Sequence, residues 1–147
     1  MSVLVEKIWE GIRSEGTNYG MPTTFVKLGM GDEYSSAEAL VKELAMKTRC
    51  RWVCIHGPGA TQVGMGMLMK GIAAIGMLIE VECSATVRDP GWLHSVDRWV
   101  VDYTDSPIFN LGALRSQDMV RFVVEGEGDL HLAKAGLEAL KKFSGTK

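Results

Sequence analysis

The 147-residue sequence has only three cysteines, no block of like charges and no long uninterrupted apolar run. A small, odd number of cysteines argues against a disulfide framework and fits a reducing compartment. The formal net charge is −2 and is not clustered, so electrostatics provides no reason to bind nucleic acid or an anionic membrane. From these absences we expect a cytoplasmic protein with neither nucleic-acid nor membrane partners.

The hydropathy of the sequence also predicts no membrane-spanning helix. The most apolar window, residues 65–81, is interrupted by Lys70 and falls short of the ~18 uncharged residues that a spanning helix needs. The N-terminal residues carry acidic side chains early and lack the apolar segment of a secretory signal. Because a chain of this length can bury a core without disulfides or metal, we expect residues 1–147 to form a single domain.

Signals for strands and helices alternate along the chain. Stretches rich in β-branched, aromatic or apolar residues predict strands at residues 23–28, 51–56, 77–83, 98–104 and 119–125. Helical spacing predicts helices at residues 35–47, 61–75 and 129–143, the first opening with the capping box Ser35-Ser36-Ala37-Glu38. Strands separated by helices favour βαβ units. We therefore expect an α/β fold with a mainly parallel sheet of about five strands and flanking helices.

In such sheets ligands bind beyond the carboxyl ends of the strands. This rule groups residues 27–31, 56–59, 82–86, 104–107 and 125–129. On the third predicted strand, alternation places Glu80 and Glu82 on one face, where buried acids require partners or a wet cavity. Two interpretations stay open. Either both acids border a solvated half-barrel interior, or Glu82, which is nearer the strand end, contacts a ligand.

The segment at residues 49–61, RCRWVCIHGPGAT, combines two cysteines with a glycine-rich turn. The turn could present amides to an anion, but the third glycine of a dinucleotide fingerprint is replaced by Gln62 and the P-loop motif is absent. Iron–sulfur clusters take cysteine thiolates. If the chain is extended, Cys50 and Cys54 lie ~13 Å apart, too far for shared ligation. Buried structural thiols are the simpler interpretation.

A family resemblance offers a third interpretation of this segment. Residues 5–28 look like the beginning of the 7-carboxy-7-deazaguanine synthases, which are radical S-adenosylmethionine (SAM) enzymes related to the organic-radical-activating enzymes. Where that family has Gln-Gly-Glu-Gly, Gly-x-Pro and Phe-Val-Arg-Leu, this chain has Arg13-Ser14-Glu15-Gly16, Gly20-Met21-Pro22 and Phe25-Val26-Lys27-Leu28. The resemblance continues in order at residues 35–47, 53–59, 79–86, 100–107 and 120–130. It implies a reduced, partial radical SAM-type barrel.

The resemblance breaks down at the iron–sulfur motif. In the family, the Phe-Val-Arg-Leu strand leads directly into Cys-x3-Cys-x2-Cys, whose thiolates hold the [4Fe–4S] cluster. Here residues 29–34 lead to the first helix without a cysteine, and residues 56–59, HGPG, lack the acid of the family's Gly-Gly-Glu-Pro. What the resemblance implies is therefore a cluster-less, non-catalytic protein that binds a small molecule or a partner. No resident cofactor is expected, and SAM is the family ligand that a remaining pocket could still take.

Matched position by position, the resemblance also implies binding residues. Glu15 and Lys27 match an acid and a base of the family's substrate pocket, and Gly57, Glu82, Ser84 and Ser106 match positions near SAM. The ligand-binding candidates are Glu15, Lys27, His56, Gly57, Glu82, Ser84 and Ser106. Each has a structural alternative: a solvated pair for Glu15 with Lys27, strand-end caps for the serines, a turn former for Gly57 and a satisfied strand-end histidine for His56.

Two further functions stay open. One is an active radical SAM enzyme whose cluster is supplied by a partner or held by Cys50, Cys54 and Cys83. The other is an interaction protein, because the predicted second helix is apolar nearly all round, with Met65, Met67, Leu68, Met69, Ile72 and Ile75. If part of that helix is exposed, a second copy of the chain or a larger radical SAM protein would cover it.

Overall fold

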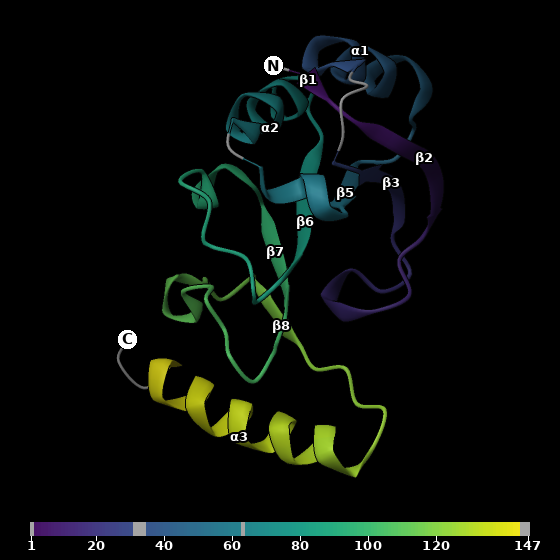
Figure 1. Ribbon diagram of the computed structural model, residues 1–147. Coiled ribbons are helices and arrows are strands. Elements are labelled where there is room, and N and C mark those ends of the chain that lie inside the picture. The colour runs from purple at the N-terminus through teal and green to yellow at the C-terminus, as the bar shows by residue number, and fades with distance from the viewer. Residues whose placement is uncertain (1, 31–34, 63, 145–147) are drawn as a thin grey trace.

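The computed structural model describes residues 2–30, 35–62 and 64–144, and its main element is a six-stranded sheet (Figure 1). The strands, in spatial order, are β2 (Val5–Ile12), β3 (Pro22–Leu28), β5 (Trp52–His56), β6 (Leu78–Ser84), β7 (Arg98–Asp102) and β8 (Met119–Arg121). All neighbours from β3 to β8 pair in parallel, and β2 adds an antiparallel edge. The expected α/β fold with a mainly parallel sheet is confirmed.

Two of the three helices supply the crossovers of this sheet. Helix α1 (Ala37–Lys47) connects β3 to β5, and α2 (Met65–Ala74) connects β5 to β6. The next two connections contain only the short 3₁₀ turns η3 (Leu93–Ser95) and η4 (Leu111–Ala113). Helix α3 (Glu127–Ser144) follows β8 and runs beside that edge of the sheet (Figure 1). Within the described ranges, no helix has both the length and the apolarity to cross a bilayer.

The N-terminal strand was not assigned from the sequence. Its pairing with β3 shifts register between Val5 and Lys7, so the alternation of apolar and polar residues is interrupted there. After this irregularity, Ile8 packs against the core while Trp9 lies on the opposite face. A period-2 pattern broken so early gives a weak strand signal. A small second sheet pairs β1 (Ser2–Val3) with β4 (Ser35–Ser36).

Element boundaries differ from the sequence predictions at several ends. The Oγ of Ser36 caps α1 by accepting a hydrogen bond from the Ala39 amide at 3.0 Å. Helix α2 begins at Met65 and not at Thr61, because Gly64 has a left-handed conformation (φ 92°), and Thr61 belongs to the preceding 3₁₀ turn η2 (Pro58–Thr61). Strand β7 ends at Asp102 and β8 ends at Arg121, both earlier than expected. Residues 31–34, where the cluster loop of the resembled family would begin, lie outside the described residues.

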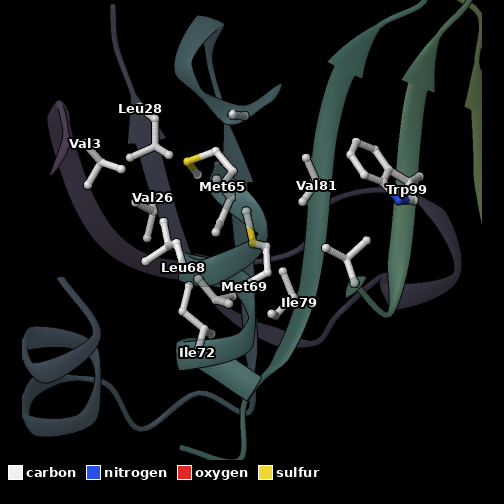
Figure 2. Packing of buried hydrophobic residues seen from close by; sticks show 14 of the residues in the cluster. Val3, Val26, Leu28, Met65, Leu68, Met69, Ile72, Ile79, Val81 and Trp99 are labelled. Atoms are coloured by element: carbon white, nitrogen blue, oxygen red, sulfur yellow. The ribbon is translucent and has the colours of Figure 1, made fainter. Parts of the chain in front are cut away.

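The hydrophobic core lies between the sheet and the helices α1 and α2. Alternate residues of the central strands point into it, and Leu68, Met69 and Ile72 of α2 meet them (Figure 2). The strand contributions are Val26, Leu28, Val53, Ile55, Ile79, Val81, Trp99 and Val101. Each of these eight is at most 1% exposed. Burial of this set therefore determines which face of every central strand turns away from the helices.

Gly57 at the end of β5 is required by backbone geometry. Its φ is +94° and its ψ is 173°, a region that is essentially restricted to glycine. A Cβ at this position would lie 2.4 Å from the carbonyl oxygen of Leu28. The next glycine, Gly59, is equally tight, since its Cβ would lie 2.3 Å from the Gly29 carbonyl oxygen. The HGPG turn is therefore packed directly against the end of β3.

We expect Gly57→Ala to lower the free energy of unfolding by at least about 2–3 kcal/mol, because the new Cβ adds a steric clash to the strained conformation. Urea denaturation followed by circular dichroism would measure the loss. Gly91→Ala is the matched control, because a Cβ there meets nothing within 4 Å. It should change stability by less than about 0.5 kcal/mol. Equal losses in the two variants would contradict this role for Gly57.

Candidate functional site

The sheet face that turns away from α1 and α2 carries charged and aromatic side chains, and we call it the polar face. Strand alternation and register place its members in rows across the sheet. They are Trp9, Phe25, Lys27, Cys54, His56, Glu80, Glu82, Ser84, Arg98, Asp102 and Arg121. The expectation that Glu80 and Glu82 share one face is confirmed. Because parallel strands end together, the last residues of β5 to β8 form one edge of this face.

A buried arginine occupies the space between the two acids. Arg13, which follows β2, is 5% exposed and places Nη2 2.8 Å from Oε1 of Glu80 and Nη1 2.5 Å from Oε1 of Glu82. Arg98 Nη1 approaches Glu80 from the other side at 3.5 Å. Glu80 is only 2% exposed. The interpretation that both acids border solvent is therefore wrong for Glu80, whose partners are guanidinium groups.

The environments of the two acids shift their pKa values in opposite directions. Burial raises the pKa of Glu80 above its usual value, although Arg13 acts against this. Burial acts the same way on Glu82, but Arg13 and Arg121 together bring the pKa of Glu82 below its usual value. Glu80 is consequently the acid of this pair that takes up a proton more readily.

A second group of charges joins the β2–β3 connection to the opposite edge of the sheet. Arg121 of β8 places Nε 2.5 Å from Oδ1 of Asp102 and donates Nη2 to Oδ2 of the same residue at 3.1 Å. Its Nη1 donates to Glu15, which lies 3.7 Å from Arg13. Arg121 Nη2 is also 3.6 Å from Oε2 of Glu82. The β2–β3 connection therefore reaches across the polar face to β8.

The carboxyl ends of β5 to β8 border a pocket of about 480 Å³. Its polar lining consists of His56, Thr61, Glu82, Ser84, Asp102 and Arg121, and Pro58 and Val87 add apolar surface. The volume lies within the range of small-molecule sites. This pocket is where the strand-end rule expects a ligand.

The structure brings together some of the predicted binding residues. His56, Gly57, Glu82 and Ser84 all line the pocket, and Glu15 contacts its wall through Arg121. Lys27 pairs instead with Glu6 at 2.5 Å, so a solvated pair between Glu15 and Lys27 is not formed. Among the described residues that line this pocket, Ser106 is missing, and its side chain is exposed in the connection after β7.

Structural roles are visible for three of these candidates. Ser84 Oγ lies 2.9 Å from Oγ1 of Thr86 and accepts from its amide at 3.2 Å, so it caps the end of β6. Gly57 makes the turn required after β5. His56 lies edge-on to Trp9 with ring centroids 5.4 Å apart, and burial lowers the pKa of its imidazole. His56 Nε2 is buried and has no hydrogen-bond partner among the described residues.

Sequence reasoning missed Asp102 and Arg121 because it placed two strand ends too late. Strand β7 was expected to end at residue 104 and β8 at residue 125, so the strand-end rule pointed past both residues. Arg13 was noted only as the replacement of a family glutamine. The alternation of Glu80 and Glu82 was the available signal, because two buried acids on one face require cations.

The three thiols lie in separate surroundings. Cys54 is buried on the polar face, with Sγ 3.5 Å from Oε1 of Glu82. Cys83 packs against the core side of β6, and Cys50 precedes β5, with Sγ 3.7 Å from Oε1 of Glu10. Successive strand residues alternate between faces, so Cys54 and Cys83 point to opposite sides of the sheet. This arrangement does not fit the ligand set of a four-iron cluster.

A single metal ion is disfavoured by the charges already present. One ligand atom each of Cys54, Glu80 and Glu82 lies within 4.8 Å of the others. The guanidinium of Arg13 contacts both carboxylates, so a cation already occupies this position. Burial raises the pKa of the Cys54 thiol, with Glu82 and Glu80 adding to the effect, which disfavours the thiolate that a metal would need.

Comparison with known proteins gives a structural match only. No protein-family model matches the chain, and no curated protein matches its sequence. The crystal structure of QueE from Escherichia coli, a 7-carboxy-7-deazaguanine synthase of the radical SAM enzymes, superposes with a TM-score of 0.62. The superposition covers 94% of this chain and 78% of QueE at 12% identity. The fold is radical SAM-like. The narrower resemblance to the 7-carboxy-7-deazaguanine synthases is not decided at this identity.

Replacement of Arg13 tests the ion cluster. We expect Arg13→Ala to lower the free energy of unfolding at pH 7 by about 3–5 kcal/mol, because it leaves Glu80 and Glu82 close together with only the longer contacts to Arg98 and Arg121. Without the guanidinium, the folded-state pKa of each acid rises. The loss should therefore begin to shrink above the ordinary carboxyl value of 4.5, as the acids of the variant take up protons, and be smallest below the lowered pKa of Glu82 in the original protein.

Urea denaturation at several pH values would measure this difference. Arg51→Ala removes the same charge from an exposed position just before β5 and is the matched control. Its effect should stay within about 0.5 kcal/mol at every pH. A loss for Arg13→Ala that is small, or that does not depend on pH, would contradict the cluster as described.

The thiols should differ in reactivity. Cys50 and Cys83 are both half-buried, but the surroundings of Cys83 raise its pKa to about 12, and burial raises the pKa of Cys54 as well. Because the thiolate is the nucleophile, we expect iodoacetamide at pH 8 to alkylate Cys50 first. Cys54 and Cys83 should react fully only after denaturation. Peptide mass spectrometry over time would follow the three sites, and equal rates in the native protein would contradict their placement.

Proposed function

We propose that this protein is a cluster-less, non-catalytic radical SAM-like protein that binds a small molecule in the pocket at the carboxyl ends of β5 to β8. The observation that carries the proposal is the insertion of Arg13 between Glu80 and Glu82. In this position the guanidinium occupies the space between the two carboxylates on the polar face. The pocket above it still presents polar groups from every strand that borders it.

The positions of the thiols support the same proposal. A radical SAM reaction needs an electron from a reduced cluster, and the thiols of Cys50, Cys54 and Cys83 do not converge on one point. The proposed protein therefore has no resident cofactor of its own. SAM is admitted as a ligand by Gly57, Glu82 and Ser84, which match family positions near SAM and line this pocket.

Partner binding is the second candidate function. Met67 on α2 is 70% exposed and borders an apolar hollow between α1 and α2 that also contains Val41, Gly71 and Ile75. A second copy of this chain or a larger radical SAM protein could cover this surface. Light scattering would detect a homodimer as a doubled mass.

Iron content distinguishes the proposal from an active enzyme. After anaerobic expression and reconstitution with iron and sulfide, we expect far less than one cluster per chain. Cys54→Ser should give the same value as the original protein. The measurement is iron and acid-labile sulfide per chain, together with the visible absorption spectrum.

A stoichiometric four-iron cluster that is lost in Cys54→Ser would overturn the proposal. It would support an active radical SAM enzyme with ligands at Cys50, Cys54 and Cys83. Cys50→Ser serves as a further comparison, because loss of the cluster in this variant as well would assign Cys50 as a ligand.

A further inference from the structure

The charges around the pocket are unbalanced. Three carboxylates, from Glu15, Glu82 and Asp102, face two guanidinium groups, from Arg13 and Arg121. The next pair, Glu80 with Arg98, lies deeper and is neutral as a unit. Burial keeps His56 from compensating, because it lowers the pKa of the imidazole. The pocket wall therefore carries one negative charge in excess.

The charged hydrogen-bond donors at the pocket are engaged with carboxylates. Arg121 gives Nε and Nη2 to Asp102 and Nη1 to Glu15. Arg13 is directed to Glu80 and Glu82 and is 5% exposed. An anionic ligand would have to compete with these carboxylates for a guanidinium group, since the other side-chain donors of the lining, such as the Thr61 hydroxyl, are uncharged.

Acceptors, in contrast, remain open to the pocket. The side chain of Asp102 is 34% exposed and that of Glu82 is 16% exposed, and both line the cavity. A carboxylate can accept several hydrogen bonds, so each retains capacity beyond its arginine partners. The hydroxyl of Thr61 adds another acceptor, while Pro58 and Val87 suit a small apolar body.

Lys27 does not reverse this balance. The resemblance implied a basic residue facing the ligand, but Lys27 pairs with Glu6 at 2.5 Å and is not among the described residues that line the pocket. The cation expected to attract a carboxylate is therefore used elsewhere.

We propose that the pocket takes a small organic cation, whose amidinium, guanidinium or ammonium group donates hydrogen bonds to Asp102 and Glu82. The inference rests on the proposed small-molecule function and specifies the charge of the ligand. A planar amidinium matches a carboxylate with two parallel hydrogen bonds, as a guanidinium does. The pocket thus selects against ligands whose net charge is negative.

The test uses three probes of nearly the same shape and different charge: benzamidine, benzamide and benzoate. Titration calorimetry of the full chain at pH 7 and low salt would measure their affinities. We expect benzamidine to bind at least about tenfold more tightly than benzamide, because charged hydrogen bonds exceed neutral ones by about that factor. Benzoate should not bind. The histidine Cε1–Hε1 NMR signals should show a shift for His56 and none for His94 or His131.

Asp102→Asn removes the more exposed of the two carboxylates that line the pocket and should weaken benzamidine binding by about tenfold. Asp105→Asn makes the same change of charge at an exposed position just beyond β7, outside the pocket lining, and should leave the affinity unchanged. Thermal unfolding of both variants would verify that they are folded. If Asp102→Asn is unfolded, the affinities of the three probes for the original protein still test whether the pocket prefers a cation.

The outcomes separate this inference from the proposed function. If benzoate binds as tightly as benzamidine or more tightly, the cation inference falls while small-molecule binding stands. If Asp102→Asn and Asp105→Asn bind benzamidine with the same affinity, Asp102 does not recognise the cation and the inference is contradicted. If none of the probes binds more tightly than about 10 mM, the inference is overturned. An assembled iron–sulfur cluster would overturn the proposed function independently of these results.

Discussion

The insertion of Arg13 between Glu80 and Glu82 is the interaction on which the polar face depends. Two acids on one strand, directed away from the helices and nearly excluded from water, would repel each other and lose hydration without a cation. The guanidinium is held by the chain that leaves β2, so the edge strand and the centre of the sheet are joined through charge. The register of β6 and the path of the β2–β3 connection are therefore mutually dependent.

The same connection gives the open sheet a partial closure. The edge strands β2 and β8 do not pair with each other, and the contact of Glu15 with Arg121 spans the polar face between them. Arg121 in turn orients Asp102 at the end of the neighbouring strand. The wall of the pocket is thus built from residues far apart in the chain, and its charge is set by this network rather than by any single motif.

The fold resembles that of a radical SAM enzyme, but the described side chains in the interior do not form an iron–sulfur site. The match to QueE covers 94% of the chain at 12% identity and shows a similar fold. The interior contains Arg13 buried between two acids, and its thiols lie in separate surroundings. Function belongs to the site and not to the fold. We therefore infer the ligand from the pocket, where the guanidinium donors are paired and the carboxylates of Glu82 and Asp102 can still accept hydrogen bonds, and not from the fold.

The sequence by itself determined the α/β class, the crossover helices and the shared face of Glu80 and Glu82, because these follow from local periodicity. It did not reveal β2, whose alternation is broken by a register shift after Val5. It also missed Asp102 and Arg121 as site residues, since the ends of β7 and β8 depend on pairing with neighbouring strands. Only the tertiary structure decided that Arg13 contacts both acids and that Lys27 lies outside the pocket. Side chains distant in sequence meet through the packing of the whole sheet, and no local pattern encodes that meeting.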